Sequence, residues 1–207
     1  MPPMVLRRLA FLIAWAAAAL ASPPGQAGEG AAGSGFTTDK LLVASEQMGD
    51  PRFMGTVIYM VSHDAQGAMG LVVNRQIGAG PFDKFLEGFG IDPGEASGDI
   101  RINYGGPVDP GRVFVLHSSE YRGAGTMALN GYLSLTTKMG VLKAIARGEG
   151  PEHSLFVFGY AGWGPGQLEG ELARADWTTA PADESLIFAD DLNGTWNKAR
   201  GKSGLAL

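Results

Sequence analysis

The sequence predicts a mixed α/β fold of the α+β kind, in a single compact domain with three to four helices. Two observations predict it. Short apolar runs rich in β-branched and aromatic residues recur along the chain, as expected for strands, and a few amphipathic segments lie between them. The helices do not alternate regularly with the strands, which argues against a doubly wound parallel sheet.

Eight segments have the composition of strands. Several are apolar at every position, as in Val113–Leu116 and Leu155–Phe158, which is typical of strands covered on both faces. Ala65–Gly67 is expected to be a hairpin loop joining two of them. The predicted strands are Leu41–Ser45, Thr56–Ser62, Met69–Asn74, Ile100–Tyr104, Arg112–His117, Tyr132–Leu135, Ser154–Tyr160 and Ser185–Ala189.

Helical spacing of apolar residues predicts the helices. The first is the clearest, because phenylalanine and leucine recur at i, i+3, i+4 and i+7 from Phe82 to Phe89. A second is predicted around Val141–Ala146 and a third at Gln167–Ala175, where glutamates near the N-terminus are favourable. Trp196–Gly201 predicts a short last helix.

Residues 1–27 have the pattern of a signal peptide. Arg7 and Arg8 precede the uncharged apolar stretch Leu9–Leu20, and small residues lead up to Ala27. As a helix the stretch spans about 18 Å, too short for a ~30 Å hydrocarbon core, although a retained anchor is the alternative. We expect a flexible lead-in over 28–37, one domain over 38–207, and no membrane span after leader removal. The mature protein is then periplasmic or secreted.

Composition excludes several classes of function. The 207 residues include no cysteine, which removes disulfides, thiol nucleophiles and cysteine metal sites. The net charge of −5 becomes −7 if Arg7 and Arg8 leave with the leader, and the remaining basic residues are scattered, so nucleic acid is an unlikely partner. Glycine accounts for 32 residues, about twice the usual ~7%, which indicates many tight turns.

The segment Gly159–Leu172 (GYAGWGPGQLEGEL) is the most distinctive in the chain. A strand running through glycines into a helix is the layout of a phosphate-binding loop. However, the loop has no Lys, Ser or Thr, and Glu169 and Glu171 would repel an anion. A tight turn that packs Trp163 against the sheet is the alternative interpretation.

Two histidines lie at predicted strand ends. His63 stands beside Asp64, and His117 ends the run GGPVDPGRVFVLH. Together they could form a general base with an orienting carboxylate, or they could be metal ligands, but no metal-binding spacing supports the second hypothesis. Hydrogen-bonded structural histidines are the third possibility. No catalytic residue, metal ligand or cofactor is assigned.

These segments together resemble the YqgE/AlgH family. The matching stretches are LLVASEQMGDPRFMGTVIYMVSHDAQGAMGLVVNR, GGPVDPGRVFVLH and GYAGWGPGQLEGELARADW, and SLIFADD resembles the closing strand and helix. The resemblance implies a strongly bent or barrel-like mixed sheet and no established enzyme activity. Members are sometimes labelled transcriptional regulators and are usually cytoplasmic, which is the alternative localisation here.

Three hypotheses of function follow. The first is a non-enzymatic binding or regulatory module with an unknown small-molecule or protein partner. The second is a hydrolase or other acid–base enzyme using His63 and His117, and the third is the transcriptional regulator of the family label. The candidate binding surface comprises His63, Asn74, Arg75, Gly105, Gly106, His117, Gly162, Trp163, Gly164 and Gln167.

Overall fold

The computed structural model describes residues 36–204. The predicted signal peptide and most of the lead-in lie outside these residues. The strands are β1 (Lys40–Ala44), β2 (Val57–Asp64), β3 (Gly67–Val72), β4 (Gln76–Pro81), β5 (Asp99–Tyr104), β6 (Val108–Ser118), β7 (Thr126–Ala128), β8 (Leu133–Thr136), β9 (Ser154–Trp163) and β10 (Trp177–Pro181). The helices are α1 (Phe82–Gly88), α2 (Gly140–Ala146), α3 (Gln167–Ala173), α4 (Glu184–Ile187) and α5 (Leu192–Lys202).

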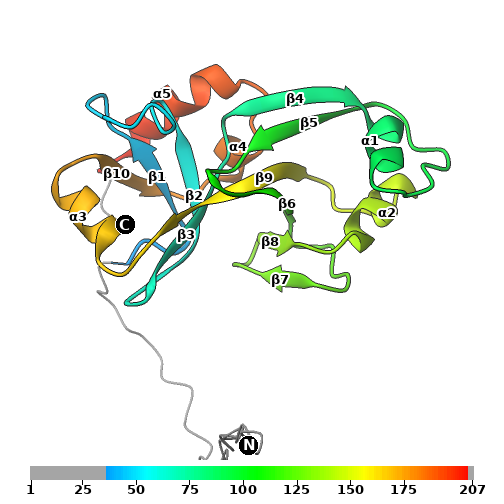
Figure 1. Ribbon diagram of the computed structural model, residues 1–207, viewed down its shortest axis with the longest axis horizontal. Coiled ribbons are helices and arrows are strands. Elements are labelled where there is room, and N and C mark those ends of the chain that lie inside the picture. Colours follow the sequence, from blue (N-terminus) through cyan, green and yellow to red (C-terminus); the bar gives the residue numbers. More distant parts are fainter. Residues whose placement is uncertain (1–35, 205–207) are drawn as a thin grey trace, which may run out of the picture. The chain divides into compact units, whose positions relative to one another are not determined.

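One curled sheet contains all ten strands. Its order is β10-β1-β2-β3-β9-β6-β8-β7, and β4 pairs with β5, which pairs with β9. Every pairing is antiparallel except β5 with β9. The mixed α/β class predicted from the sequence, and the strongly bent sheet that the family resemblance implied, are confirmed (Figure 1).

The long strand β9 joins the two parts of the sheet. Its first half pairs with β5 and β6, and its last residues, from Ala161, pair with β3. Gly159 lies between the two halves with φ of 70°, a conformation that favours glycine. The sheet therefore changes direction where β9 passes from one set of neighbours to the other.

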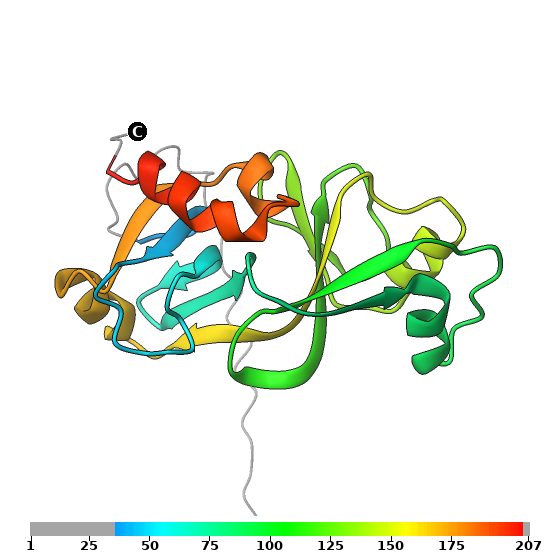
Figure 2. The same ribbon diagram turned by 90° about the horizontal axis from the view of Figure 1, so that it is seen from above.

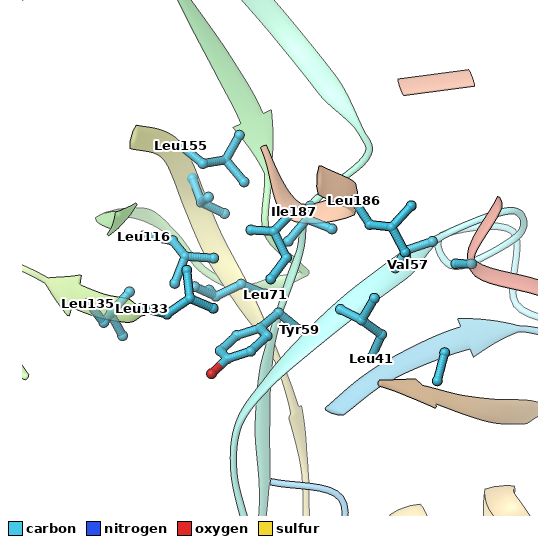
Figure 3. Packing of buried hydrophobic residues seen from close by; sticks show 14 of the residues in the cluster. Leu41, Val57, Tyr59, Leu71, Leu116, Leu133, Leu135, Leu155, Leu186 and Ile187 are labelled. Carbon is cyan, nitrogen blue, oxygen red and sulfur yellow. The ribbon is translucent and has the colours of Figure 1, made fainter. Parts of the chain in front are cut away.

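Both faces of the central strands are covered, as the continuous apolar runs predicted. Leu41 and Val43 of β1 belong to one buried cluster, whereas Leu42 and Ala44 belong to another. The first cluster fills the inside of the curl and is closed by Leu186, Ile187 and Ala199 from α4 and α5 (Figure 3). Figure 2 shows α4 and α5 along one side of the sheet and α1 with α2 at one end of it.

The strand predicted at Ser185–Ala189 is wrong, because this segment contains the helical turn α4. The Asp183 side chain accepts a hydrogen bond from the Ser185 N–H at 2.8 Å, which caps the turn. Leu186 and Ile187 are buried. A short apolar run therefore indicated burial correctly, but it could not distinguish a strand from one helical turn.

Three strands were not predicted. β4 contains two glycines and ends in proline, β7 has three residues, and β10 has two adjacent threonines and ends in proline. All three pair with other strands of the sheet. The helices predicted from helical spacing are confirmed, and α5 starts earlier, at Leu192, because Asp191 caps it by accepting from the Gly194 N–H.

Candidate functional site

The Gly159–Leu172 segment forms a polar cluster around one carboxylate. The indole N–H groups of Trp163 and Trp177 both donate to Glu171 Oε2 at 2.8 Å, and Gln167 Nε2 donates to Oε1 at 3.0 Å. The Gly164 N–H donates to Gln167 Oε1 at 3.1 Å. Both tryptophans are buried, and their N–H groups need an acceptor there. By accepting from both, the Glu171 carboxylate stabilises the turn that follows β9. The geometry favours the tight-turn interpretation over the phosphate-binding loop.

His63 is buried beneath the first described residues of the chain. The Thr37 backbone N–H donates to His63 Nδ1 at 3.0 Å, which leaves the ring proton of the neutral imidazole on Nε2. Within residues 36–204, His63 Nε2 has no hydrogen-bond partner, and Glu169 Oε1 is 3.4 Å away. Asp64 does not pair with His63, because Asp64 Oδ1 accepts from the Gln66 N–H in the hairpin turn.

His117 is fully buried and ends a short chain of two threonine hydroxyl groups. Its Nδ1 donates to the Ser118 carbonyl at 2.8 Å, so its Nε2 accepts from Thr136 Oγ1 at 2.9 Å. Thr136 in turn accepts from Thr126 Oγ1 at 2.7 Å. Burial lowers the pKa of His117 below its ordinary value, which keeps the ring neutral. This histidine connects β6 through β8 to β7.

The two histidines lie at opposite ends of β9. His63 pairs with Ala68, which pairs with Trp163, the last residue of β9. His117 pairs with Ser154, the first residue of β9. Nine residues of extended chain correspond to about 30 Å along the strand. The structure therefore does not bring the histidines together as an acid–base pair.

Asn74 and Arg75 hold the loop before β2. Asn74 accepts from the Val57 N–H at 2.8 Å and donates to the Gly55 carbonyl at 2.9 Å. Arg75 donates to the carbonyls of Arg52 and Met54. The polar groups of both side chains are hydrogen-bonded to the loop backbone, and neither side chain contributes to the environment of His63 or His117.

Gly105 and Gly106 lie buried against β9. The Gly105 N–H donates to the Phe158 carbonyl at 2.8 Å, and Gly106 has φ of 152°. A Cβ at position 106 would collide with the backbone of Tyr160 and Ala161. Both glycines thus permit two backbones to cross closely.

A cleft of about 600 Å³ opens on the inside of the curled sheet. The β2–β3 hairpin lies on one side, and β7 with β8 lies on the other (Figure 1). Phe114 and Leu135 of its lining belong to the inner core cluster, and Val61, Met69 and Tyr160 pack against that cluster. The floor of the cleft is therefore the uncovered end of the hydrophobic core. Its volume suits a small ligand.

The rim of the cleft combines an exposed apolar side chain with a cation. Met127 of β7 is 50% exposed. The guanidinium of Arg112 lies 5.0 Å from the Phe114 ring centroid, and it forms no ion pair with any residue between Phe36 and Gly204. Asp64 also lines the cleft, but its carboxylate is engaged in the hairpin turn.

Of the residues predicted for the binding surface, only Trp163 lines this cleft. The others are distributed over the two histidine environments, the loop before β2, the glycine crossing and the Glu171 cluster. Sequence reasoning missed Arg112, Phe114 and Met127, although Arg112 begins a predicted strand and is the one charged residue in that strand. Only the register and the curl of the sheet bring these residues to one site.

Neither a metal centre nor a membrane helix is found within the part of the chain that the structure describes. No three His, Asp or Glu side chains in residues 36–204 are grouped as metal ligands. No helix in the same range has the length and apolar character needed to cross a bilayer.

Known proteins with similar sequences identify the family. A family model described as AlgH-like matches residues 41–207. The chain belongs to the AlgH-like family. A UPF0301 protein of Methylococcus capsulatus is 52% identical over 175 residues, covering 84% of this chain and 96% of the relative. A UPF0301 protein of Rhodospirillum rubrum is 45% identical, covering 83% and 89%.

Two solved structures share the AlgH-like fold. The solution structure of the AlgH protein from Pseudomonas aeruginosa is 40% identical, with a TM-score of 0.70, covering 83% of this chain and 90% of that one. A crystal structure of a Corynebacterium diphtheriae protein has a TM-score of 0.61 at 20% identity, which shows the fold alone.

The first prediction concerns the Glu171 cluster. Glu171→Ala leaves two buried indole N–H groups unpaired, so we expect the free energy of unfolding to fall by about 2–4 kcal/mol. Glu171→Gln keeps an acceptor oxygen and should cost less than about 1.5 kcal/mol. Urea unfolding measures both. Glu149→Ala, at an exposed glutamate, is the control and should stay within about 0.5 kcal/mol; equal stability of Glu171→Ala and wild type would contradict the assignment.

The second prediction concerns His117. Its folded-state pKa is lowered, so below about pH 6.5 the unfolded chain binds more protons than the folded protein. The stabilisation is complete above about pH 6.5 and is lost as the pH falls toward the folded-state pKa. Urea unfolding at pH 7.5 and 5.5 should show a smaller loss in His117→Gln than in wild type. The exposed histidine provides the control, His153→Gln, which should behave as wild type; equal losses in all three proteins would refute the role.

Proposed function

We propose that this AlgH-like protein is a non-enzymatic binding or regulatory module, and that the inner-face cleft is its binding site. The observation that carries the proposal is the uncovered end of the core between β3 and β7. Apolar side chains of a core are normally covered, and an apolar cleft with a few polar groups is the usual form of a ligand site.

The composition of the cleft supports binding rather than catalysis. Its apolar floor comes from β2, β3, β6, β8 and β9, so the sheet positions it rigidly. The cation Arg112 stands at the rim without an ion partner among the described residues. The ring nitrogens of His117 are both hydrogen-bonded, one of them to Thr136 of β8. Neither His63 nor His117 lines the cleft. The occupant supported best has an apolar body and a negatively charged group.

Thermal unfolding with a library of small amphipathic carboxylates and sulfonates tests the proposal. A ligand at one hundred times its Kd stabilises by about 2.7 kcal/mol, which corresponds to a rise in Tm of about 5–10 °C for a domain of this size. Thr137→Trp fills the cleft and should abolish the rise.

The matched control is Ala173→Trp, which adds the same ring on the exposed end of α3, outside the cleft. It should retain the rise seen in wild type. Stabilisers that act equally on Thr137→Trp would place binding elsewhere. If Thr137→Trp reduces the effect of none of these compounds, the cleft is not their binding site.

We also propose that the protein is periplasmic or secreted, with the cytoplasm as the alternative. The basic pair and the apolar stretch Leu9–Leu20 support export. Fractionation and N-terminal sequencing of the native protein should find a mature chain beginning at Gly28 outside the cytoplasm. A cytoplasmic protein that begins at Met1 or Pro2 would contradict export.

A further inference from the structure

The strand β7 is the free edge of the sheet beside the cleft. It pairs with β8 on one side and is the last strand in the sheet order, so among the described strands nothing pairs with its other side. An exposed edge presents unpaired N–H and C=O groups to which another strand can be added. Most such edges are protected, and this one lies next to an open apolar cleft.

The hydrogen-bond pattern identifies which groups of β7 face outward. The Leu129 N–H donates to the Leu133 carbonyl, and antiparallel pairing alternates along the ladder. The backbone of Met127 therefore faces β8, whereas the N–H and C=O of Ala128 and the C=O of Thr126 face the free edge. The Thr126 N–H is occupied by the Gly123 carbonyl.

The side chains of β7 are divided between two faces. Thr126 Oγ1 bonds to Thr136 on the His117 side, which anchors the strand. Met127 points the other way and lines the cleft. A strand added to the edge of β7 would extend the sheet toward the β2–β3 hairpin, and alternate side chains of that strand would enter the cleft.

The charge around the cleft selects the partner. Arg112 lines the cleft, and Lys138 packs against Gly125, which lines it too. Asp64 is the one acidic residue of the lining, and its carboxylate accepts from the Gln66 N–H in the hairpin turn. Neither cation has an ion pair within residues 36–204, in a protein whose net charge is −5. A second copy of this chain would bring the same cations together, so self-pairing of β7 is disfavoured, whereas an acidic segment is attracted.

We propose that the cleft takes an extended segment of a partner protein, with alternating apolar and acidic side chains, which adds to β7 as a further strand. This inference rests on the proposed function and names the class of its occupant. Backbone hydrogen bonds to Ala128 and Thr126 supply the pairing, the apolar side chains cover Phe114 and Leu135, and a carboxylate reaches Arg112. Strand addition of this kind combines backbone pairing with side-chain pockets.

Selection from a phage-displayed heptapeptide library on the full chain tests the proposal, with Kd values of synthetic copies measured by fluorescence polarisation. We expect enriched peptides that alternate apolar and acidic residues. Ala128→Pro removes an outward N–H at an edge position that tolerates proline, and should weaken binding at least tenfold. Arg112→Gln should weaken it about tenfold. Arg147→Gln removes the same charge at an exposed position at the end of α2, away from the cleft, and should leave the Kd unchanged.

Two further measurements keep the outcomes distinct. Peptides methylated at alternate backbone nitrogens on the pairing edge should lose binding while keeping their side chains. If enriched peptides are blocked by Thr137→Trp but ignore Ala128→Pro and methylation, the cleft binds ligands and strand addition is wrong. Selection without any binder overturns strand addition as well, while small-molecule stabilisers still test the cleft independently. A wild-type dimer that Ala128→Pro converts to a monomer would make a second copy the occupant, which also overturns the proposal.

Discussion

The close crossing of the β5–β6 connection over β9 is the constraint on which the rest of this structure depends. Gly105 and Gly106 lie against the backbone of Gly159 and Tyr160, at a separation that no side chain at these positions would allow. Gly105 also links two strands, because its N–H donates to Phe158 and its carbonyl accepts from Val72. The sheet bends at this point, and the bend creates the inner face that holds both the main core cluster and the cleft.

Several side chains in the distinctive sequence segments serve mainly this architecture. The Trp163–Glu171–Trp177 cluster fixes the turn after β9, Asn74 and Arg75 fix the loop before β2, and the glycines permit the crossing. A hydrogen-bonded cluster that satisfies buried polar groups stabilises a unique arrangement of strands. These side chains hold the fold, whereas the cleft is lined mainly by others, among them Arg112 and Met127; Trp163 takes part in both.

Much of the fold could be predicted from the sequence, but little of the candidate site could. Apolar runs such as Leu41–Val43 located central strands because burial on both faces leaves a pattern that composition reveals. The strands β4 and β7 escaped prediction because glycine and short length remove that pattern. The segment Ser185–Ala189 has the composition of a strand, but it contains the helical turn α4, which Asp183 caps by accepting from the Ser185 N–H.

The site required tertiary information of two kinds. His63 meets Glu169 rather than its neighbour Asp64, because α3 packs near the β2–β3 hairpin. Arg112, Phe114 and Met127 come together only through the order β9-β6-β8-β7 and the curl of the sheet. A period of two along one strand indicates which side chains share a face, but it does not show which strands are neighbours.

The stability of one glycine variant tests the dependence on the backbone crossing most directly. Gly106→Ala places a Cβ against the backbone of β9 in a conformation that disfavours side chains, whereas Gly111→Ala adds the same methyl group in open space. The free energy of unfolding in urea should fall by about 3 kcal/mol or more for Gly106→Ala, and change by less than about 1 kcal/mol for Gly111→Ala. A Gly106→Ala protein as stable as wild type would contradict the account.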